Sequence, residues 1–277
     1  MKISIATDFS SRSDRAMDRA LQLGEAKGCT VRVINALEHL DASQADWDKL
    51  ERKMSEYIGD PPCDTESAFL EGAPPLAIAR DCENQKPEML LIGPARYNSL
   101  GDYFLGTSVD YVLRNTRRPV IVVKQRPRSP YRHIFAGTDF SAGSAHAIEK
   151  AVKLFPKAEM HIVHAWRIPY AGFQGDAYVG DEIEQGAQEK MKRFIDVLTD
   201  RVPALKEATT SVVKGNTQYA IMQEIDKRSD HAGEALVAVG SHGTSGFRQA
   251  TLGSQTSDLL RYLRHDILVV NTAEADN

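Results

Sequence analysis

Glycines in the second half of the chain are spaced as in a loop that binds phosphate. The letters GSHG at 240–243 are followed by nine residues and then by GS at 253–254. Glycine lets backbone amides approach phosphate oxygens because no Cβ stands in the way, and a helix amino end adds unpaired amides and a favourable dipole. Ser254 and Thr256 add two hydroxyl groups. The pattern predicts a phosphate cradle, with simple strand termination at Gly240 as the alternative.

The first half departs from this pattern at the matching place. GPAR stands at 93–96, and nine residues later comes GT at 106–107. Arg96 replaces the second glycine, where a positive φ would cost roughly 1 to 3 kcal/mol and the side chain would fill space that phosphates need. Pro94 removes one amide donor. We expect this half to be degenerate as a phosphate site, while direct pairing of the Arg96 guanidinium with phosphate stays open.

Three histidines are candidates for site residues. His161 and His164 are three positions apart in a strand, which puts them on opposite faces, so chelation of a metal ion by that pair is not expected. We expect His161 to pack at a strand end and His164 to lie beside the ligand or behind it. His242, inside the glycine pattern, either contacts the ligand or fills the turn.

The elements that position these residues occur twice, because the chain repeats itself. ISIATDFS at 3–10 returns as HIFAGTDFS at 133–141, so Asp8 and Asp139 are 131 positions apart. The same apolar helical pattern follows each copy. Ser10 and Ser141 are expected to cap these two helices at their amino ends.

Each copy continues as apolar strands alternating with amphipathic helices. Such near-continuous apolar strands indicate a parallel sheet that helices cover on both faces. The second copy carries 16 extra residues, which we expect to form an extended loop around 168–181. The expected later strands are 31–35, 89–92 and 119–123 in the first copy and 160–165, 235–239 and 266–270 in the second, with last helices at 107–115 and 254–263.

The segment KQRPRSPYR at 124–132 separates the copies. Its two prolines and four basic residues are typical of a solvated connector, with an anion- or partner-binding patch as the alternative. The expected domains are therefore 1–126 and 132–277. Because the last strand of each copy is an apolar sheet edge, we expect the two edges to cover one another.

Composition sets the broad class. The 277 residues fit two domains, and a net charge of −4, from 34 basic and 38 acidic residues, gives no general attraction to nucleic acid or anionic membranes. Three cysteines without a C-x-x-C spacing predict reduced thiols and no cysteine zinc site. No stretch of about 20 apolar residues exists, so a cytoplasmic protein is the simplest interpretation.

An aspartate after the first strand and G-x-x-G, nine residues, G-[ST] after the fourth together resemble the universal stress protein family in its tandem form. The resemblance covers nearly the whole chain. It implies two α/β doubly wound domains, each a five-stranded parallel sheet in the order 3-2-1-4-5 flanked by helices, packed as a pseudo-dimer. It also implies an adenine nucleotide at the carboxyl ends of strands 1 and 4, the topological switch point.

The resemblance assigns a role to each residue of the second copy that matches the family site. Asp139 would hold the ribose or adenine side, Ala165 would lie by the adenine, and Gly240 and His242 would border the ribose and first phosphate. The residues that would line the phosphates are Gly243, Gly253, Ser254, Gln255 and Thr256. The remaining expected contacts are Thr138 and Val239. The ligand would be ATP, or AMP or ADP, and Mg²⁺ would accompany the phosphates because the motif holds few basic residues.

The function expected from the resemblance is a stress-response protein that binds nucleotide in its second domain and acts through protein partners not yet identified. The alternative is an interaction scaffold that needs no nucleotide. An enzyme is the weakest class, because TDFS replaces the S-G-G-x-D-[ST] loop of related ATP-consuming folds, and the sequence contains neither a P-loop nor a dinucleotide fingerprint. Slow hydrolysis of ATP and a homodimer of two chains stay open.

Overall fold

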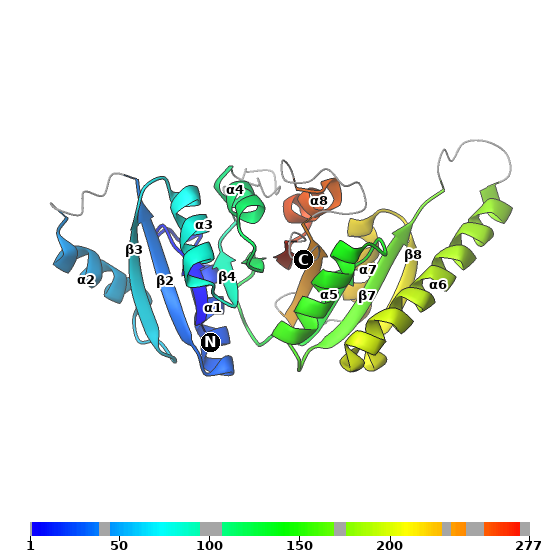
Figure 1. Ribbon diagram of the computed structural model, residues 1–277, viewed down its shortest axis with the longest axis horizontal. Coiled ribbons are helices and arrows are strands. Elements are labelled where there is room, and N and C mark those ends of the chain that lie inside the picture. The colour runs from blue at the N-terminus through cyan, green and yellow to red at the C-terminus, as the bar shows by residue number, and fades with distance from the viewer. Residues whose placement is uncertain are drawn as a thin grey trace.

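The computed structural model describes residues 2–38, 45–94, 107–168, 176–228, 234–241 and 252–271. Within them one mixed sheet of ten strands runs through the molecule, and helices lie on both of its faces (Figure 1). The α/β class expected from the sequence is confirmed.

The first half alternates strands and helices. Its elements are β1 (Lys2–Ala6), α1 (Asp14–Lys27), β2 (Thr30–Leu37), α2 (Trp47–Ile58), β3 (Thr65–Glu71), α3 (Pro74–Gln85), β4 (Met89–Ile92), α4 (Thr107–Asn115) and β5 (Val120–Val122).

The second half repeats this order, with a short 3₁₀ helix added. Its elements are β6 (His133–Gly137), α5 (Ala142–Leu154), β7 (Glu159–Trp166), α6 (Asp176–Arg201), η1 (Pro203–Glu207), β8 (Thr209–Lys214), α7 (Thr217–Arg228), β9 (Ala235–Gly240), α8 (Ser254–Tyr262) and β10 (Asp266–Val270).

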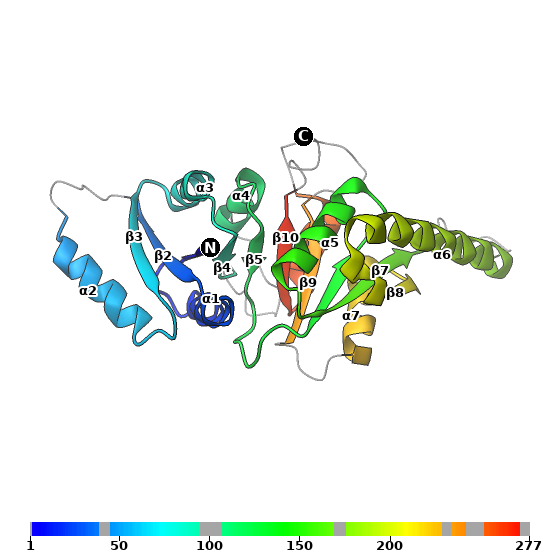
Figure 2. The same ribbon diagram turned by 60° about the horizontal axis from the view of Figure 1, so that its bottom comes forward.

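Strand order confirms the expected topology in each half. The sheet runs β3-β2-β1-β4-β5-β10-β9-β6-β7-β8, so each half is parallel in the order 3-2-1-4-5. The halves join where β5 pairs antiparallel with β10, with Ile121 opposite Leu268 (Figure 2). Both strands are fully buried, so the two apolar edges cover one another within a single chain, as expected.

Two hydrophobic layers sandwich this sheet. One contains α1, α2, α5 and α6, with Met17, Met54 and Ile148 among its buried side chains. The other contains α3, α4, α7 and α8, represented by Leu113 and Leu260. Each layer spans both halves, and α1 and α5 lie on the same face. The halves are thus related by a pseudo-two-fold axis that passes through the sheet between β5 and β10.

The extra residues of the second half correct one expectation. Residues 176–181, expected in an extended loop, are the first turns of α6, which has 26 residues against 12 for α2. Gly180 lies in the stretch for which a loop is expected. In the structure its position is packed, because a Cβ placed there would lie 3.5 Å from Ile168 and 3.8 Å from Trp166. Packing on β7 therefore outweighs the weak helix propensity of glycine.

The connector between the halves is only partly solvated, which corrects a second expectation. Lys124 is 1% exposed, and its Nζ donates to the carbonyl oxygens of Leu260 and Leu263 at the end of α8, at 2.7 and 2.5 Å. Tyr131 is also buried, and its hydroxyl donates to Asp266. The arginines of the connector, Arg126, Arg128 and Arg132, are exposed to solvent as expected.

The two serines expected as helix caps differ. Ser141 caps α5, since its side chain accepts the amide of Ser144. Ser10 does not cap α1, which begins later, at Asp14, after a turn in which the Ser13 amide donates to the Ser10 carbonyl. Residues 11–13 form this turn where the second half is already helical, so the helix of the first half begins one turn after Ser10.

Candidate functional site

The candidate site lies where the strands of the second half end at their carboxyl side. β6 lies between β7 and β9, so residues that follow these three strands meet at one edge. Thr138 and Asp139 follow β6, Ala165 is the last residue but one of β7, and Gly240 ends β9. The fold thus brings together residues such as Thr138 and Gly240, which are 102 positions apart in the sequence.

The turn after β6 is built by its own side chains. The Asp139 carboxylate accepts the Ser141 amide at 3.1 Å and the Ser141 hydroxyl at 2.5 Å, an Asx turn that exposes Asp139 at the sheet edge. The Thr138 hydroxyl accepts the amide of Phe140 at 2.9 Å. Phe140 has φ of +64°, a left-handed conformation that costs a bulky residue of order 1 to 3 kcal/mol. The hydrogen bonds of the turn offset that strain.

The amino end of α8 lies beside the end of β9. The Gly253 amide donates to the Ser241 carbonyl at 2.9 Å, and the Thr256 hydroxyl donates to the Gly240 carbonyl at 2.8 Å. Gly253 is the N-cap and has no side chain to satisfy the first amides of the helix. Ser254 and Gln255 are exposed. This helix end could therefore bind an anion through its free amides and the exposed Ser254 hydroxyl. The Thr256 hydroxyl donates its proton to the Gly240 carbonyl instead.

A cavity of about 490 Å³ opens next to these residues. Ala165 and Gln255, which the family resemblance assigns to opposite ends of one ligand, both line it. The remaining lining is mostly polar and comes from the segment after β7, the start of α7 and α8. It consists of Arg167, Gly215, Asn216, Thr217, Gln218, Asp258, Leu259 and Tyr262. The volume is within the range of pockets that hold small molecules.

His164 has a positioning role at this edge. Its Nδ1 donates to the Thr138 carbonyl at 2.8 Å, and its ring packs on Phe140 at 4.2 Å between centroids. In the first half Asn35 makes the same bond, to the carbonyl of Thr7, at 2.8 Å. Both side chains tie the end of the second strand to the turn after the first. His164 thus lies behind the site, one of the two places expected from the sequence.

Two expected site residues, His242 and Gly243, lie outside the described residues, as does Arg96 of the first half. Val239 is 5% exposed and packs in the core, so it offers the site only its main chain. Sequence reasoning missed Arg167, an exposed cation that directly follows β7. Its position at the carboxyl end of a parallel strand was the signal that could have identified it.

The corresponding edge of the first half is lined differently. Arg12 forms an ion pair with Asp8 at 3.8 Å, and its carbonyl oxygen lies 2.7 Å from where a Cβ on Gly93 would stand. The main chain before α1 therefore fills the space between the ends of β1 and β4. Gly143 occupies the position of Arg12 in the second half.

The contacts of Asp8 with its neighbours also change the pKa of its carboxyl group. Burial alone would raise the pKa of Asp8, but hydrogen bonds from Ser10 and Ser13 and the guanidinium of Arg12 bring this pKa below its usual value. The carboxylate of the first half is thus ionised and engaged by its own neighbours.

Comparison with known proteins agrees with this architecture. The model of the universal stress protein family matches residues 1–124 and again residues 130–271. The chain belongs to the universal stress protein family. A curated relative, universal stress protein YxiE of Bacillus subtilis (strain 168), is 28% identical over 149 residues, which cover 50% of this chain and 99% of the relative.

A solved structure of a universal stress protein shows the same fold over nearly the whole chain. A universal stress protein from Archaeoglobus fulgidus DSM 4304 has a TM-score of 0.70 at 17% identity, over 98% of both chains. A universal stress protein solved in complex with cAMP covers 44% of this chain and 95% of its own, at 24% identity and a TM-score of 0.37. Among the described residues of this universal stress protein, no helix is long and apolar enough to cross a membrane.

Proposed function

We propose that this universal stress protein binds one adenine nucleotide per chain, ATP with Mg²⁺ in the first place, at the carboxyl edge of its second half. The cavity between β7, α7 and α8 supports the proposal most strongly, because residues assigned to the adenine (Ala165) and to the phosphates (Gln255) both line it. The lining offers polar side chains from α7 and α8, one exposed cation, Arg167, and one exposed carboxylate, Asp258, and the amino end of α8 begins beside it.

Arg167 is the group that sharpens this proposal. Phosphates bring negative charge, and a guanidinium beside them supplies charge-assisted hydrogen bonds. The first half has Glu38 after its second strand, at the place where the second half has Arg167. At this position, therefore, the second half would attract an anion with Arg167, and the first half would repel it with Glu38.

Protein partners would then bind the nucleotide-bound and nucleotide-free forms of the chain differently.

We place the protein in the cytoplasm. Its three cysteines are free, and two of them, Cys29 and Cys82, are buried, which suits a reducing compartment. Burial raises the pKa of Cys82 to about 12, so that this thiol is not reactive at neutral pH.

Calorimetry of the full chain with Mg²⁺ and ATP tests the proposal. We expect Arg167→Glu to weaken ATP binding by at least about tenfold, a loss of about 1.4 kcal/mol. The control is Arg193→Glu, which reverses an exposed charge on α6 that pairs with Glu189. Equal ATP affinity in both variants would remove Arg167 from the site.

Thermal unfolding separates this function from the scaffold alternative. At free ATP of about 100 times Kd, binding stabilises the folded chain by roughly 2.7 kcal/mol, which should raise the midpoint by about 5 °C. AMP and cAMP serve as competitors that lack the outer phosphates. A chain whose midpoint moves with none of the three nucleotides is a scaffold that does not use them.

A further inference from the structure

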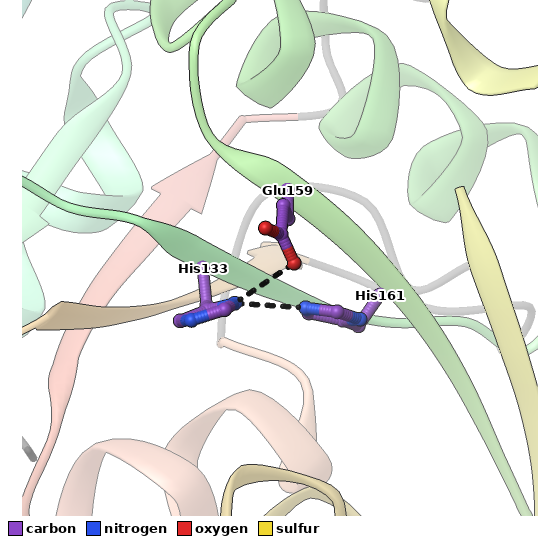
Figure 3. Close-up of side chains that lie close together, drawn as sticks. All are labelled: His133, Glu159 and His161. Carbon is purple, nitrogen blue, oxygen red and sulfur yellow. Dashed lines mark hydrogen bonds and ion pairs between the residues drawn. The ribbon is translucent and has the colours of Figure 1, made fainter. Parts of the chain in front are cut away.

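Three potential metal ligands lie together at the opposite edge of the sheet, far from the nucleotide site. His133 begins β6, and Glu159 and His161 are the first and third residues of β7, so all three are at the amino ends of parallel strands (Figure 3). His133 and Glu159 are direct neighbours across the two strands. The strand register, which the sequence does not display, is what joins them.

The ligand atoms have the spacing of a metal coordination sphere. His133 Nδ1 lies 3.1 Å from His161 Nε2 and 3.5 Å from the Glu159 carboxylate, and the three ligand atoms all lie within 4.8 Å of one another. Zinc binds imidazole nitrogen and carboxylate oxygen at about 2.0 to 2.2 Å, so tetrahedral ligand atoms are about 3.3 Å apart. The side chains need only small rotations to enclose an ion.

A second set of contacts holds the His161 ring in place. Its Nδ1 lies 2.6 Å from the Thr209 hydroxyl on β8, and Phe135 stacks on the ring at 4.7 Å between centroids. If Nδ1 donates to Thr209, Nε2 carries the lone pair that points at His133. Such an outer hydrogen bond is typical of histidines that bind metal.

Exposure leaves room for a ligand from solvent. His161 is 4% exposed, while the side chains of His133 and Glu159 are 16% and 73% exposed. Three protein ligands with one open position are the arrangement of zinc sites that keep a bound water. The nearby cation Arg228 is already paired with the buried carboxylate of Glu224.

The first half closes the same edge with ion pairs. Lys2 and Arg32 occupy the positions of His133 and His161, and Glu66 occupies that of Thr209. Lys2 Nζ lies 2.7 Å from Glu66, which also contacts Arg32, and Arg32 contacts Asp81 at 3.0 Å. These charges satisfy one another. The imidazoles at the same positions of the second half have nitrogen lone pairs that can bind a metal ion, which the charged Lys2 and Arg32 lack.

We propose that His133, Glu159 and His161 form a binding site for one divalent transition-metal ion of the zinc class, with water in the fourth position. Two imidazoles and a carboxylate favour such an ion over Mg²⁺ or Ca²⁺, which take mostly oxygen ligands. The ion would tie the start of β6 to the start of β7. The site does not depend on nucleotide binding.

The test is a titration of the full chain, freed of metal by a chelator, with ZnCl₂ in a calorimeter at neutral pH. We expect one ion per chain, and His133→Gln and His161→Gln should each weaken binding by at least about tenfold. Glu207→Gln, an exposed carboxylate of the same half, should bind as the wild type does. CoCl₂ provides a second readout, because cobalt bound by nitrogen ligands in a tetrahedral site absorbs visible light.

A transplant of the first-half network checks that loss of binding is not loss of fold. The variant His133→Lys, His161→Arg, Thr209→Glu copies the residues that close the edge of the first half, and its circular dichroism should match the wild type. We expect it to bind no zinc. A wild-type chain that binds no zinc, so that the histidines are joined only by a hydrogen bond, overturns the proposal, as does unchanged binding in both single histidine variants.

Discussion

The carboxyl edges of the two halves share a framework and differ in what lines it. Both have the T-D-F-S turn with a left-handed phenylalanine, φ of +58° at Phe9 and +64° at Phe140. Both tie the second strand to that turn, through Asn35 or His164. The turn and its ties are therefore features of the repeated fold, and they do not by themselves mark a ligand site.

Differences between the edges concentrate where a ligand would lie. The second half starts α7 after Asn216 and opens with Thr217 and Gln218, whereas the corresponding start of α3 follows Ala73 and opens with two prolines. Prolines have no amide to donate. Together with Glu38 in place of Arg167, the first half has fewer amide donors and less positive charge than the second half at the same spot. This difference is what we expect if the second half alone binds nucleotide.

The largest effect that separates the halves is expected at their shared edge. Lys124 follows β5 and binds the carboxyl end of α8, while Asn271 follows β10 and donates to Thr116, beyond α4, at 3.0 Å. Because Lys124 is buried, Lys124→Met leaves buried carbonyls without a donor and should lower the free energy of unfolding by about 3 kcal/mol or more.

Asn271→Ala removes one neutral hydrogen bond and should cost only about 1 kcal/mol. Urea unfolding of the full chain measures both variants. Equal losses would show that the pseudo-symmetric contacts are equivalent and that burial of Lys124 is not what stabilises this edge.

A smaller but more specific effect comes from copying the first half into the second. Gly243→Arg places the residue type of Arg96 in the intact pattern, where its bulk would occupy the space of the phosphates. We expect ATP affinity to fall by at least about tenfold, with AMP affected less because it lacks the outer phosphates. Equal losses for both nucleotides would place position 243 away from the outer phosphates.

The reverse change, Arg96→Gly, should not create a second ATP site. Glu38 and the prolines that begin α3 remain, and the main chain of Arg12 still fills the space beside Gly93. Calorimetry of this variant that shows a second ATP site would mean that Arg96 alone disables the first half.

The smallest effect concerns acid stability of the amino edges. Hydrogen bonding from Lys2 lowers the pKa of Glu66 below its usual 4.5, with Arg32 adding to it. A carboxyl group whose pKa is lower in the folded state stabilises the fold above its unfolded pKa and loses that contribution as pH falls. Glu66 is partly exposed, so we expect a loss of less than about 1 kcal/mol below pH 4.5. Glu66→Gln should remove this part of the pH dependence in urea unfolding, and an unchanged acid limb would contradict it.

Much of the fold follows from local patterns, which explains why it could be predicted. The repeat, the apolar strands and the edges that cover one another depend on sequence periodicity and burial, and the structure confirms them in the strand order. The failures involve packing between distant segments. Gly180 is helical because α6 packs against β7, and Lys124 is buried because the other half supplies carbonyl acceptors.

The site residues show the same limit. The spacing of glycines pointed to the end of β9 and the start of α8, which the structure places side by side through the bond from Thr256 to Gly240. Arg167 and the polar residues at the start of α7 belong to no sequence motif. They line the cavity only because the fold places the end of β7 beside the start of α7. His133 and His161 likewise meet through strand register, 28 positions apart.

Calorimetric titration of the full chain with Mg²⁺ and ATP tests the central claim, that only the second half binds nucleotide. The account predicts one site per chain for the wild type, and no measurable site of that affinity in Gly243→Arg. Two equal sites per chain, or a single site that Gly243→Arg leaves intact, would contradict it.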